Sequence, residues 1–277
     1  MIDEFLISAH AFYSWTEELM SAKYFHPVEI ARFLSHPEAI TAWEKRSKDP
    51  EYANYLSNKR YEAFDRLEKP YGILTGGYML DTQKWLNEIR NFLNEHEFLS
   101  EGELGIDDST DEYDAIIYAT GAVGPVVSSG LIPNKGEALI VSMPEWKFPA
   151  IIKEDVFFVP MTEEHLFWVG SYYEPWPENA NTTTEGKQLL IQAIQKVYQG
   201  PFEIQQHLSG IRPTMNDRRP LVGRLPGYIG KYIFNGMGTK GTSLAPYWAE
   251  HLIDHLEFDN PINKLVDPKR YKNQQSG

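Results

Sequence analysis

The segment Tyr232-Ile233-Phe234-Asn235-Gly236-Met237-Gly238-Thr239-Lys240-Gly241 places a glycine-rich turn directly after a short apolar run. The turn has the spacing G-x-G-x-x-G, and the pattern predicts a strand before it and a helix over residues 243–256 after it. Glycines let a backbone approach a ligand closely, and a helix N-terminus offers free N–H groups and a partial positive charge. We therefore expect this turn to face an anion or a cofactor.

Two other interpretations of the turn stay open. A dinucleotide pyrophosphate fingerprint needs a second strand with an acidic residue about 20 positions further on. Residues 260–263 form a poor strand, and neither Glu257 nor Asp259 ends a convincing one. The third interpretation is a glycine turn with a purely structural role.

The rest of the chain mixes helical and strand patterns. Apolar spacing predicts helices over residues 2–20, 36–56, 82–93 and 184–197. Residues 114–121 form an apolar run ending in glycine, which is typical of a parallel strand buried on both faces. Residues 29–34 resemble a weak strand, and residues 138–141, 156–159 and 166–170 predict an antiparallel sheet. We expect a mixed α/β fold (α+β in part) with two interleaved domains and a frayed tail over residues 267–277.

Composition excludes several functional classes. The chain has 277 residues and a formal net charge of −13, which argues against nucleic-acid partners because binding phosphates needs a basic surface. It contains no cysteine, which excludes disulfides, thiolate catalysis and cysteine-bound metals. The first residues are acidic, and the most apolar stretch, residues 115–127, is interrupted by glycine and proline. We expect a cytoplasmic protein without an integral membrane segment.

A second motif runs from Gly210 to Gly223 and contains Arg212 followed by Pro213. Proline biases the preceding residue toward extended geometry, so the guanidinium is expected to project from a strand end. Its planar donor fork suits a carboxylate. The alternative is an ordinary surface or interface arginine.

Four segments resemble motifs of one enzyme group. Residues 113–121 resemble the late flavin-domain strand and ATG turn of FAD-dependent oxidoreductases, and Lys135-Gly136-Glu137-Ala138-Leu139 is similar to their KGQ-x-L segment. Residues 210–223 resemble the pattern GxRPxxxDxxPxxG, and residues 236–246 resemble the terminal G-x-G-x-x-G-x-x-x-A-P segment. In this order, they resemble the D-amino-acid oxidase, glycine oxidase and sarcosine oxidase superfamily over roughly residues 76–256.

The resemblance implies FAD as cofactor and an amine or amino acid as substrate. It implies that Arg212 holds the substrate carboxylate, and that Thr120 and Gly121 lie near the ribose and pyrophosphate. It implies hydride transfer from the substrate carbon to flavin N5, with no catalytic base assigned to the protein. The residues implied along the pyrimidine edge of the flavin are Gly236, Gly238, Thr239, Lys240, Gly241 and Thr242.

The resemblance also divides the chain and exposes a gap. It assigns residues 1–20, 76–130 and 224–277 to an incomplete FAD/NAD(P)-binding-like domain, and residues 21–75 and 131–223 to an antiparallel-sheet substrate domain. The family opens with a βαβ unit of on the order of 30 residues, which has no counterpart here. We expect an FAD-dependent oxidoreductase; the alternative is a truncated, cofactor-free, non-catalytic remnant of that fold.

Three weaker patterns predict other sites. His251 and His255 have a spacing that suits a metal, but packing or solvation is the preferred interpretation. Ser243 lies in a loosened G-x-S-x-G pattern, although His255 on the same predicted helix cannot turn back onto it. The acidic run over residues 101–114 suggests calcium, but a solvated hairpin turn is preferred. Tyr172, Tyr173 and Trp176 are candidate pocket walls.

Overall fold

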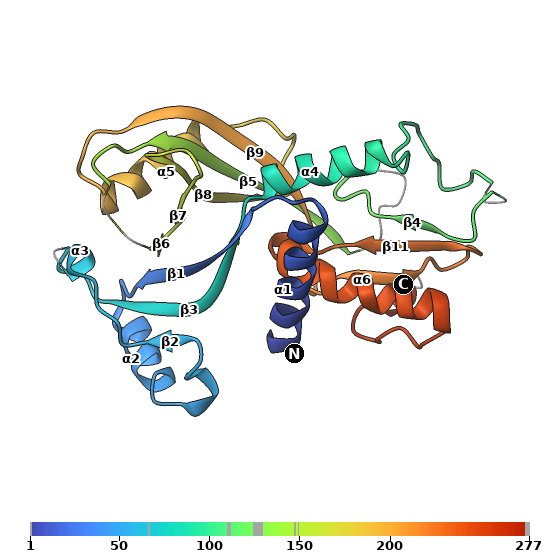
Figure 1. Cartoon of the computed structure of the whole chain (residues 1–277), viewed down its shortest axis with the longest axis horizontal. Helices are drawn as coiled ribbons and strands as arrows, with labels where there is room; N and C mark the ends of the chain where they lie inside the picture. Colours follow the sequence, from blue (N-terminus) through green and yellow to red (C-terminus); the bar gives the residue numbers. More distant parts are fainter. Residues whose placement is uncertain are drawn as a thin grey trace.

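The computed structural model describes residues 2–274, apart from residues 66, 110–111, 124–129, 147 and 149. The chain forms two lobes, and Figure 1 shows α1 standing between them. A large sheet with α5 builds one lobe, and a small sheet with α6 builds the other. The fold is the mixed α/β arrangement expected from the sequence.

The elements follow one another as mixed helices and strands. The α-helices are α1 Ile2–Leu19, α2 Pro37–Arg46, α3 Glu62–Asp65, α4 Thr82–Glu95, α5 Thr184–Val197 and α6 Gly241–Phe258. The strands are β1 Phe25–Phe33, β2 Leu56–Ser57, β3 Tyr71–Leu80, β4 Ile116–Tyr118, β5 Leu131–Ser142, β6 Ile151–Lys153, β7 Phe157–Pro160, β8 Leu166–Pro175, β9 Glu203–Met215, β10 Leu221–Arg224 and β11 Lys231–Asn235. Short 3-10 helices are η1 Pro50–Tyr52, η2 Gly238–Lys240 and η3 Pro268–Gln274.

The large sheet has the order β2-β3-β1-β6-β7-β8-β5-β9. Its pairs are antiparallel as expected, except that β1 and β6 run parallel, so the sheet is mixed. One face packs against α5, with Leu139 and Val169 from the strands meeting Leu190 and Ile194 from the helix. Residues that alternate with these along β5, such as Ala138 and Ile140, point to the other face and are buried as well.

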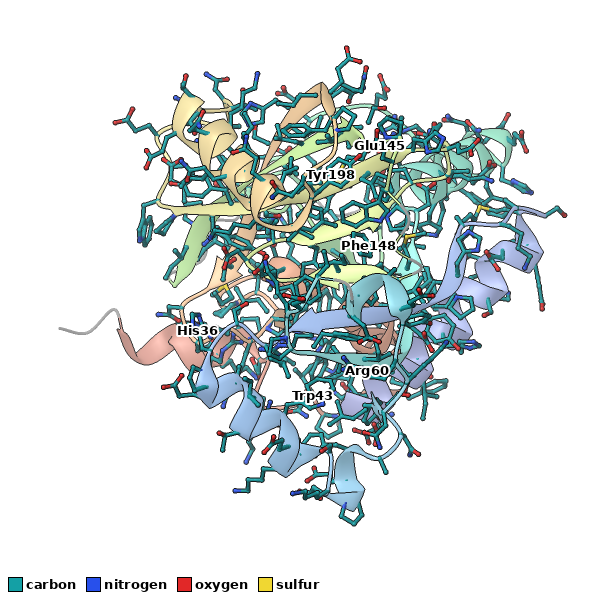
Figure 2. The ribbon with its side chains drawn as sticks, turned by 90° about the vertical axis from the view of Figure 1, so that its left-hand side faces the viewer. His36, Trp43, Arg60, Glu145, Phe148 and Tyr198 are labelled. Atoms are coloured by element: carbon teal, nitrogen blue, oxygen red, sulfur yellow. The ribbon has the colours of Figure 1, made fainter. Side chains whose placement is uncertain are left out.

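Aromatic side chains close the core of the large lobe beyond the end of β5, where Figure 2 labels Phe148 and Tyr198. Phe148 stacks on Phe64 of α3 with ring centroids 5.0 Å apart. The hydroxyl of Tyr198 accepts a hydrogen bond from the Glu145 N–H at 3.2 Å. These contacts fix the segment after β5, so this lobe is packed by its own side chains.

The small sheet has the order β10-β11-β4, with β4 and β11 parallel. On one face Tyr232 packs against Trp248 and Leu252 of α6, and α1 joins through Phe5, whose ring lies 5.9 Å from that of Trp248. Burial of β4 on both faces was expected, but Ile117 is 40% exposed. The helix α6 covers its neighbour Tyr232 and leaves Ile117 half uncovered.

Some predicted elements differ from the structure. The helix expected over residues 36–56 ends at Arg46, because Asp49 precedes Pro50 and adopts extended geometry. The tail is not frayed over its described part: Tyr271 is buried, and Arg270 pairs with Asp217 at 2.9 Å. The predicted domain boundaries at 75/76 and 223/224 fall inside β3 and β10, and the domain division stays a prediction.

Candidate functional site

Arg212 lies near the end of β9, on the face of the large sheet opposite α5, in a seat built by three neighbouring residues. Its Nη2 donates to Ser171 Oγ at 2.9 Å, and its guanidinium lies 5.0 Å from the Tyr173 ring centroid. A Cβ on Gly136 of β5 would collide with the guanidinium, so the missing side chain makes room for the arginine. The sheet therefore holds Arg212 in one orientation.

One donor of this arginine is left over. Nη1 is buried without a hydrogen-bond partner, and no carboxylate among the described residues lies within ion-pair distance of Arg212. Burial lowers the pKa of Arg212, since the charge is partly desolvated. A cavity of about 260 Å³ opens beside it, and its lining includes Trp168, Ser171 and Gly210. A small carboxylate placed there would satisfy both the charge and the free N–H.

The glycine loop, residues 236–242, follows β11 and leads through η2 into α6. Gly236 and Gly238 adopt φ of +75° and +56°, a region that residues with a Cβ rarely occupy. A Cβ on Gly236 would also lie 2.6 Å from Met215 Cγ. The glycines are therefore required for a turn that presents the first N–H groups of η2 and α6.

Pro246 lies inside the first turns of α6 and has no N–H for the carbonyl of Thr242. The hydroxyl of Tyr13 from α1 donates to that carbonyl at 2.9 Å instead. Burial raises the pKa of Tyr13 to about 12, so the hydroxyl keeps its proton at neutral pH. Thus a side chain of α1 supplies the hydrogen bond that the proline removes from the first turns of α6.

Thr214 connects Arg212 to the glycine loop. It lies two residues beyond Arg212 on the same face of β9, a distance of about 7 Å along the strand. Thr214 bridges to Met237, and a Cβ on Gly238 would lie 3.3 Å from Thr214 Oγ1. Hence the guanidinium and the loop lie on the same side of the molecule.

The ATG turn, residues 119–121, follows β4 beside the glycine loop. Gly121 has φ of +69° with open space around its Cα, and its carbonyl accepts a hydrogen bond from Asn235 Nδ2 at 2.8 Å. Buried hydroxyls of Thr120 and Thr214 have no partner among the described residues. These orphaned hydroxyls, together with the open space at Gly121, fit a polar ligand lying along both turns.

The weaker candidates have structural roles. His251 Nε2 accepts from the Asn263 N–H at 3.0 Å, and His255 Nδ1 lies 2.7 Å from the Asn260 carbonyl, so both bind the chain after α6. Ser243 Oγ donates to the Lys240 carbonyl at 3.1 Å. No group of three or more potential metal ligands occurs in the part of the chain that the structure describes.

The acidic run does not form the expected hairpin, because it connects a helix, α4, to a strand, β4. Gly105 N–H donates to Asp108 Oδ2 at 2.6 Å, which closes a local turn. The Lys231 ammonium donates to the Asp108 carbonyl at 2.8 Å and thereby anchors the segment. Asp111 lies outside the described residues.

A larger cavity of about 660 Å³ lies among the described residues between α2, β3 and the start of α1, and none of the predicted site residues lines it. Trp43 of α2, labelled in Figure 2, forms part of its wall. We place the site at Arg212 instead, because the orphaned polar groups and the positive-φ glycines gather there.

Sequence reasoning missed several residues that build the site. Ser171, Thr214 and Asn235 are single polar residues in strands. Ser171 contacts Arg212 of β9, whereas Thr214 and Asn235 contact the turns that follow β11 and β4. The one available signal was spacing, since Thr214 lies two positions from Arg212 on an extended segment and must share its face.

A search against protein-family models matches residues 86–255 to the DAO family, described as FAD dependent oxidoreductase. The chain belongs to this family. The matched range contains Arg212, the ATG turn and the glycine loop. No helix among the described residues has the length and apolar character needed to cross a membrane.

Solved structures share the fold of this family member. Glycine oxidase from Geobacillus kaustophilus matches with a TM-score of 0.76 and 17% identity, over 94% of this chain and 80% of that chain. Iminodiacetate oxidase from a Chelativorans species matches with a TM-score of 0.72 and 19% identity, over 95% and 81%. L-proline dehydrogenase from P. horikoshii matches with a TM-score of 0.71 and 12% identity, over 98% and 83%.

A curated relative matches over a shorter range. It is the tRNA 5-methylaminomethyl-2-thiouridine biosynthesis bifunctional protein MnmC from a Caulobacter species, 32% identical over 72 residues. The match covers 24% of this chain and 12% of that protein. The chain therefore corresponds to a small part of that relative.

Proposed function

We propose that this chain binds FAD and oxidises a small amine or amino acid whose carboxylate is held by Arg212. The observation that carries the proposal is the buried, unpartnered Nη1 of Arg212, a residue that lines a cavity and lies two positions before Thr214, which bridges to the glycine loop. Membership of the FAD-dependent oxidoreductase family supports the cofactor. Two solved proteins that share the fold are a glycine oxidase and an iminodiacetate oxidase, which supports a carboxylated amine as substrate.

In this proposal each residue has a separate role. Arg212 binds the carboxylate, and Ser171 and Tyr173 keep its guanidinium aimed into the cavity. Residues of the glycine loop and the N-terminus of α6 face the pyrimidine end of the flavin, where their N–H groups stabilise negative charge. Thr120 and Gly121 lie toward the ribose and pyrophosphate. When bound, FAD supplies the group that accepts a hydride at flavin N5.

A small substrate fits this chain better than a polynucleotide. The curated relative's name includes tRNA, but its match covers 24% of this chain. The net charge of −13 repels a phosphate backbone, and a cavity of about 260 Å³ has the size of a small carboxylated group. We therefore propose a free amine or amino acid as the substrate.

FAD titration tests the cofactor. Quenching of flavin fluorescence and a rise in melting temperature with added FAD are expected, because a ligand that binds the folded state stabilises it. If the protein is colourless and its melting temperature does not change on addition of FAD, the result would instead support the interpretation of a cofactor-free remnant. This measurement separates the two expectations without knowledge of the substrate.

The carboxylate role of Arg212 has its own test. Arg212→Ala is expected to raise KM for a carboxylated amine roughly 10- to 150-fold, since it removes about 1.5–3 kcal/mol of charge-assisted hydrogen bonding. KM for the same amine without the carboxylate should stay nearly unchanged. Arg212→Lys keeps the charge but loses the planar fork, so it should recover only part of the affinity. Equal effects on both substrates would remove the assigned role.

A further inference from the structure

Asn235 is the last residue of β11, and its side chain spans the gap between the two turns of the proposed cofactor site. Its Nδ2 donates to the Gly121 carbonyl at 2.8 Å, and its Oδ1 accepts from the Gly236 N–H at 2.8 Å. The residue is buried, with 5% of its surface exposed. One amide therefore holds a backbone group of the ATG turn and one of the glycine loop.

The strand ladder stops short of this point. The pairing of β4 with β11 ends at Tyr118 and Ile233, two residues before Asn235. Beyond this point, the segments that follow β4 and β11 each turn through a glycine with positive φ, Gly121 and Gly236. Among the described residues, no other side-chain hydrogen bond joins residues 119–123 to residues 235–242.

We propose that Asn235 is a positioning residue that couples the ATG turn to the glycine loop and thereby sets the geometry in which both contact FAD. The inference rests on the proposed function, because it concerns how the two ends of that cofactor are held in register. Asn235 acts through Gly121 and Gly236 and reaches no reacting atom.

The chemistry of the bridge requires an amide. The Gly121 carbonyl needs a donor and the Gly236 N–H needs an acceptor, and the amide supplies both from one planar group. An ionised aspartate has the same shape but no donor, so its second oxygen would face the Gly121 carbonyl. That repulsion raises the pKa of such a carboxyl, and protonation restores an O–H donor. Hence Asn235→Asp turns the bridge into one that depends on pH.

The experiment measures the FAD dissociation constant by quenching of flavin fluorescence between pH 5 and 8. Asn235→Asp is expected to bind FAD about 10- to 100-fold more weakly than wild type at pH 8 and to recover most of the loss at pH 5. Asn235→Ala should bind weakly at every pH. Asn263→Asp is the matched control, because Asn263 uses only its oxygen, which accepts from the Leu265 N–H at 2.9 Å, and it should follow wild type.

Amide hydrogen exchange on the FAD-free protein supplies a readout without cofactor. In Asn235→Ala, exchange should rise in both turns, at residues 119–123 and at residues 236–242, with the melting temperature lowered only slightly. The inference would be overturned if Asn235→Asp bound FAD at pH 8 as tightly as wild type does, or if its FAD binding were weakened equally at all pH values. It would also be overturned if amide exchange in Asn235→Ala rose only in the glycine loop. If the wild type failed to bind FAD, the proposed function would be overturned. Amide hydrogen exchange would then be the remaining test of whether Asn235 couples the ATG turn to the glycine loop.

Discussion

The two sides of the candidate site are held by different means. On the substrate side, Arg212 lies on an eight-stranded sheet whose other face is packed against α5. On the cofactor side, the turns end two strands of a three-stranded sheet, and Asn235 joins them. The comparison indicates that the seat of Arg212 is preorganised by packing, whereas the ATG turn and the glycine loop depend on a few individual hydrogen bonds.

The largest expected effect concerns the packed side, at Glu137 on the α5 face of β5. This buried carboxylate accepts from the Thr183 N–H at 2.9 Å and hydroxyl at 2.8 Å, and it lies 3.4 Å from the Lys135 ammonium. Burial alone would raise the pKa of Glu137, but these donors outweigh it and lower the pKa. Glu137→Ala should lower the free energy of unfolding by about 3–5 kcal/mol in urea denaturation, since it removes one partner of the buried Lys135 and leaves the Thr183 N–H and hydroxyl without their acceptor.

Glu174→Ala is the control for that experiment. Glu174 pairs with the same Lys135 at 2.7 Å but is partly exposed, so its loss should cost about 1 kcal/mol or less. Equal losses from the two variants would contradict the view that burial on the α5 face makes the sheet rigid.

A second prediction uses a pair of glycines that face each other across β5 and β9. Gly136 pairs with Gly210, yet a Cβ collides with Arg212 at the first and meets open space at the second. Gly136→Ala should raise KM for a carboxylated amine roughly 5- to 150-fold, equivalent to about 1–3 kcal/mol of overpacking. Gly210→Ala should stay within about twofold of wild type. If both variants bind substrate normally, the seat of Arg212 is not fixed by the sheet.

The smallest expected effect lies on the cofactor side, where Tyr13 satisfies the carbonyl that Pro246 leaves free. Tyr13→Phe should lower the free energy of unfolding by about 1–2 kcal/mol at pH 7. The pKa of Tyr13 is about 12 in the folded protein, above the value of about 10 for an unfolded chain. Its stabilising contribution is therefore complete below pH 10 and is lost as pH rises toward 12.

Urea denaturation across that pH range checks the sign. The difference between wild type and Tyr13→Phe should shrink as pH rises from 10 to 12, because only wild type loses the bond. Tyr78→Phe removes a hydroxyl from a ring that is 44% exposed and is the control for the loss of a tyrosine hydroxyl. If the difference in free energy of unfolding between wild type and Tyr13→Phe stayed constant over this range, ionisation of the Tyr13 hydroxyl would not be linked to unfolding.

Much of the fold could be predicted because its periodic segments are strong. The predicted helix over residues 184–197 agrees with α5, and those at residues 2–20 and 82–93 agree with α1 and α4 to within two residues. By contrast, β3 was missed, because it contains three glycines. Of β9, only the extended geometry at Arg212 was predicted, because the residues before it alternate exposed polar side chains that the pattern does not distinguish from loops.

Residues of the candidate site could be proposed from the sequence where they belong to a motif, but not where their contacts depend on strand register. Arg212 and the glycine loop belong to motifs that are continuous in the sequence, so they could be recognised as candidates from the sequence alone. The contacts of Gly136 with Arg212 and of Asn235 with Gly121 join residues that are far apart in sequence. Such contacts follow from the pairing of strands, which single-sequence periodicity does not specify.

The order of the strands in the small sheet has a consequence for biosynthesis. Its parallel partners, β4 and β11, lie about 110 residues apart in sequence, and the whole of β5 to β9 is made between them. At ribosomal rates β4 waits on the order of 10 s for its partner to emerge. We therefore expect the large sheet to assemble before the small one. A nascent chain released before residue 235 would leave β4 without its parallel partner and expose an unpaired strand edge, which favours aggregation.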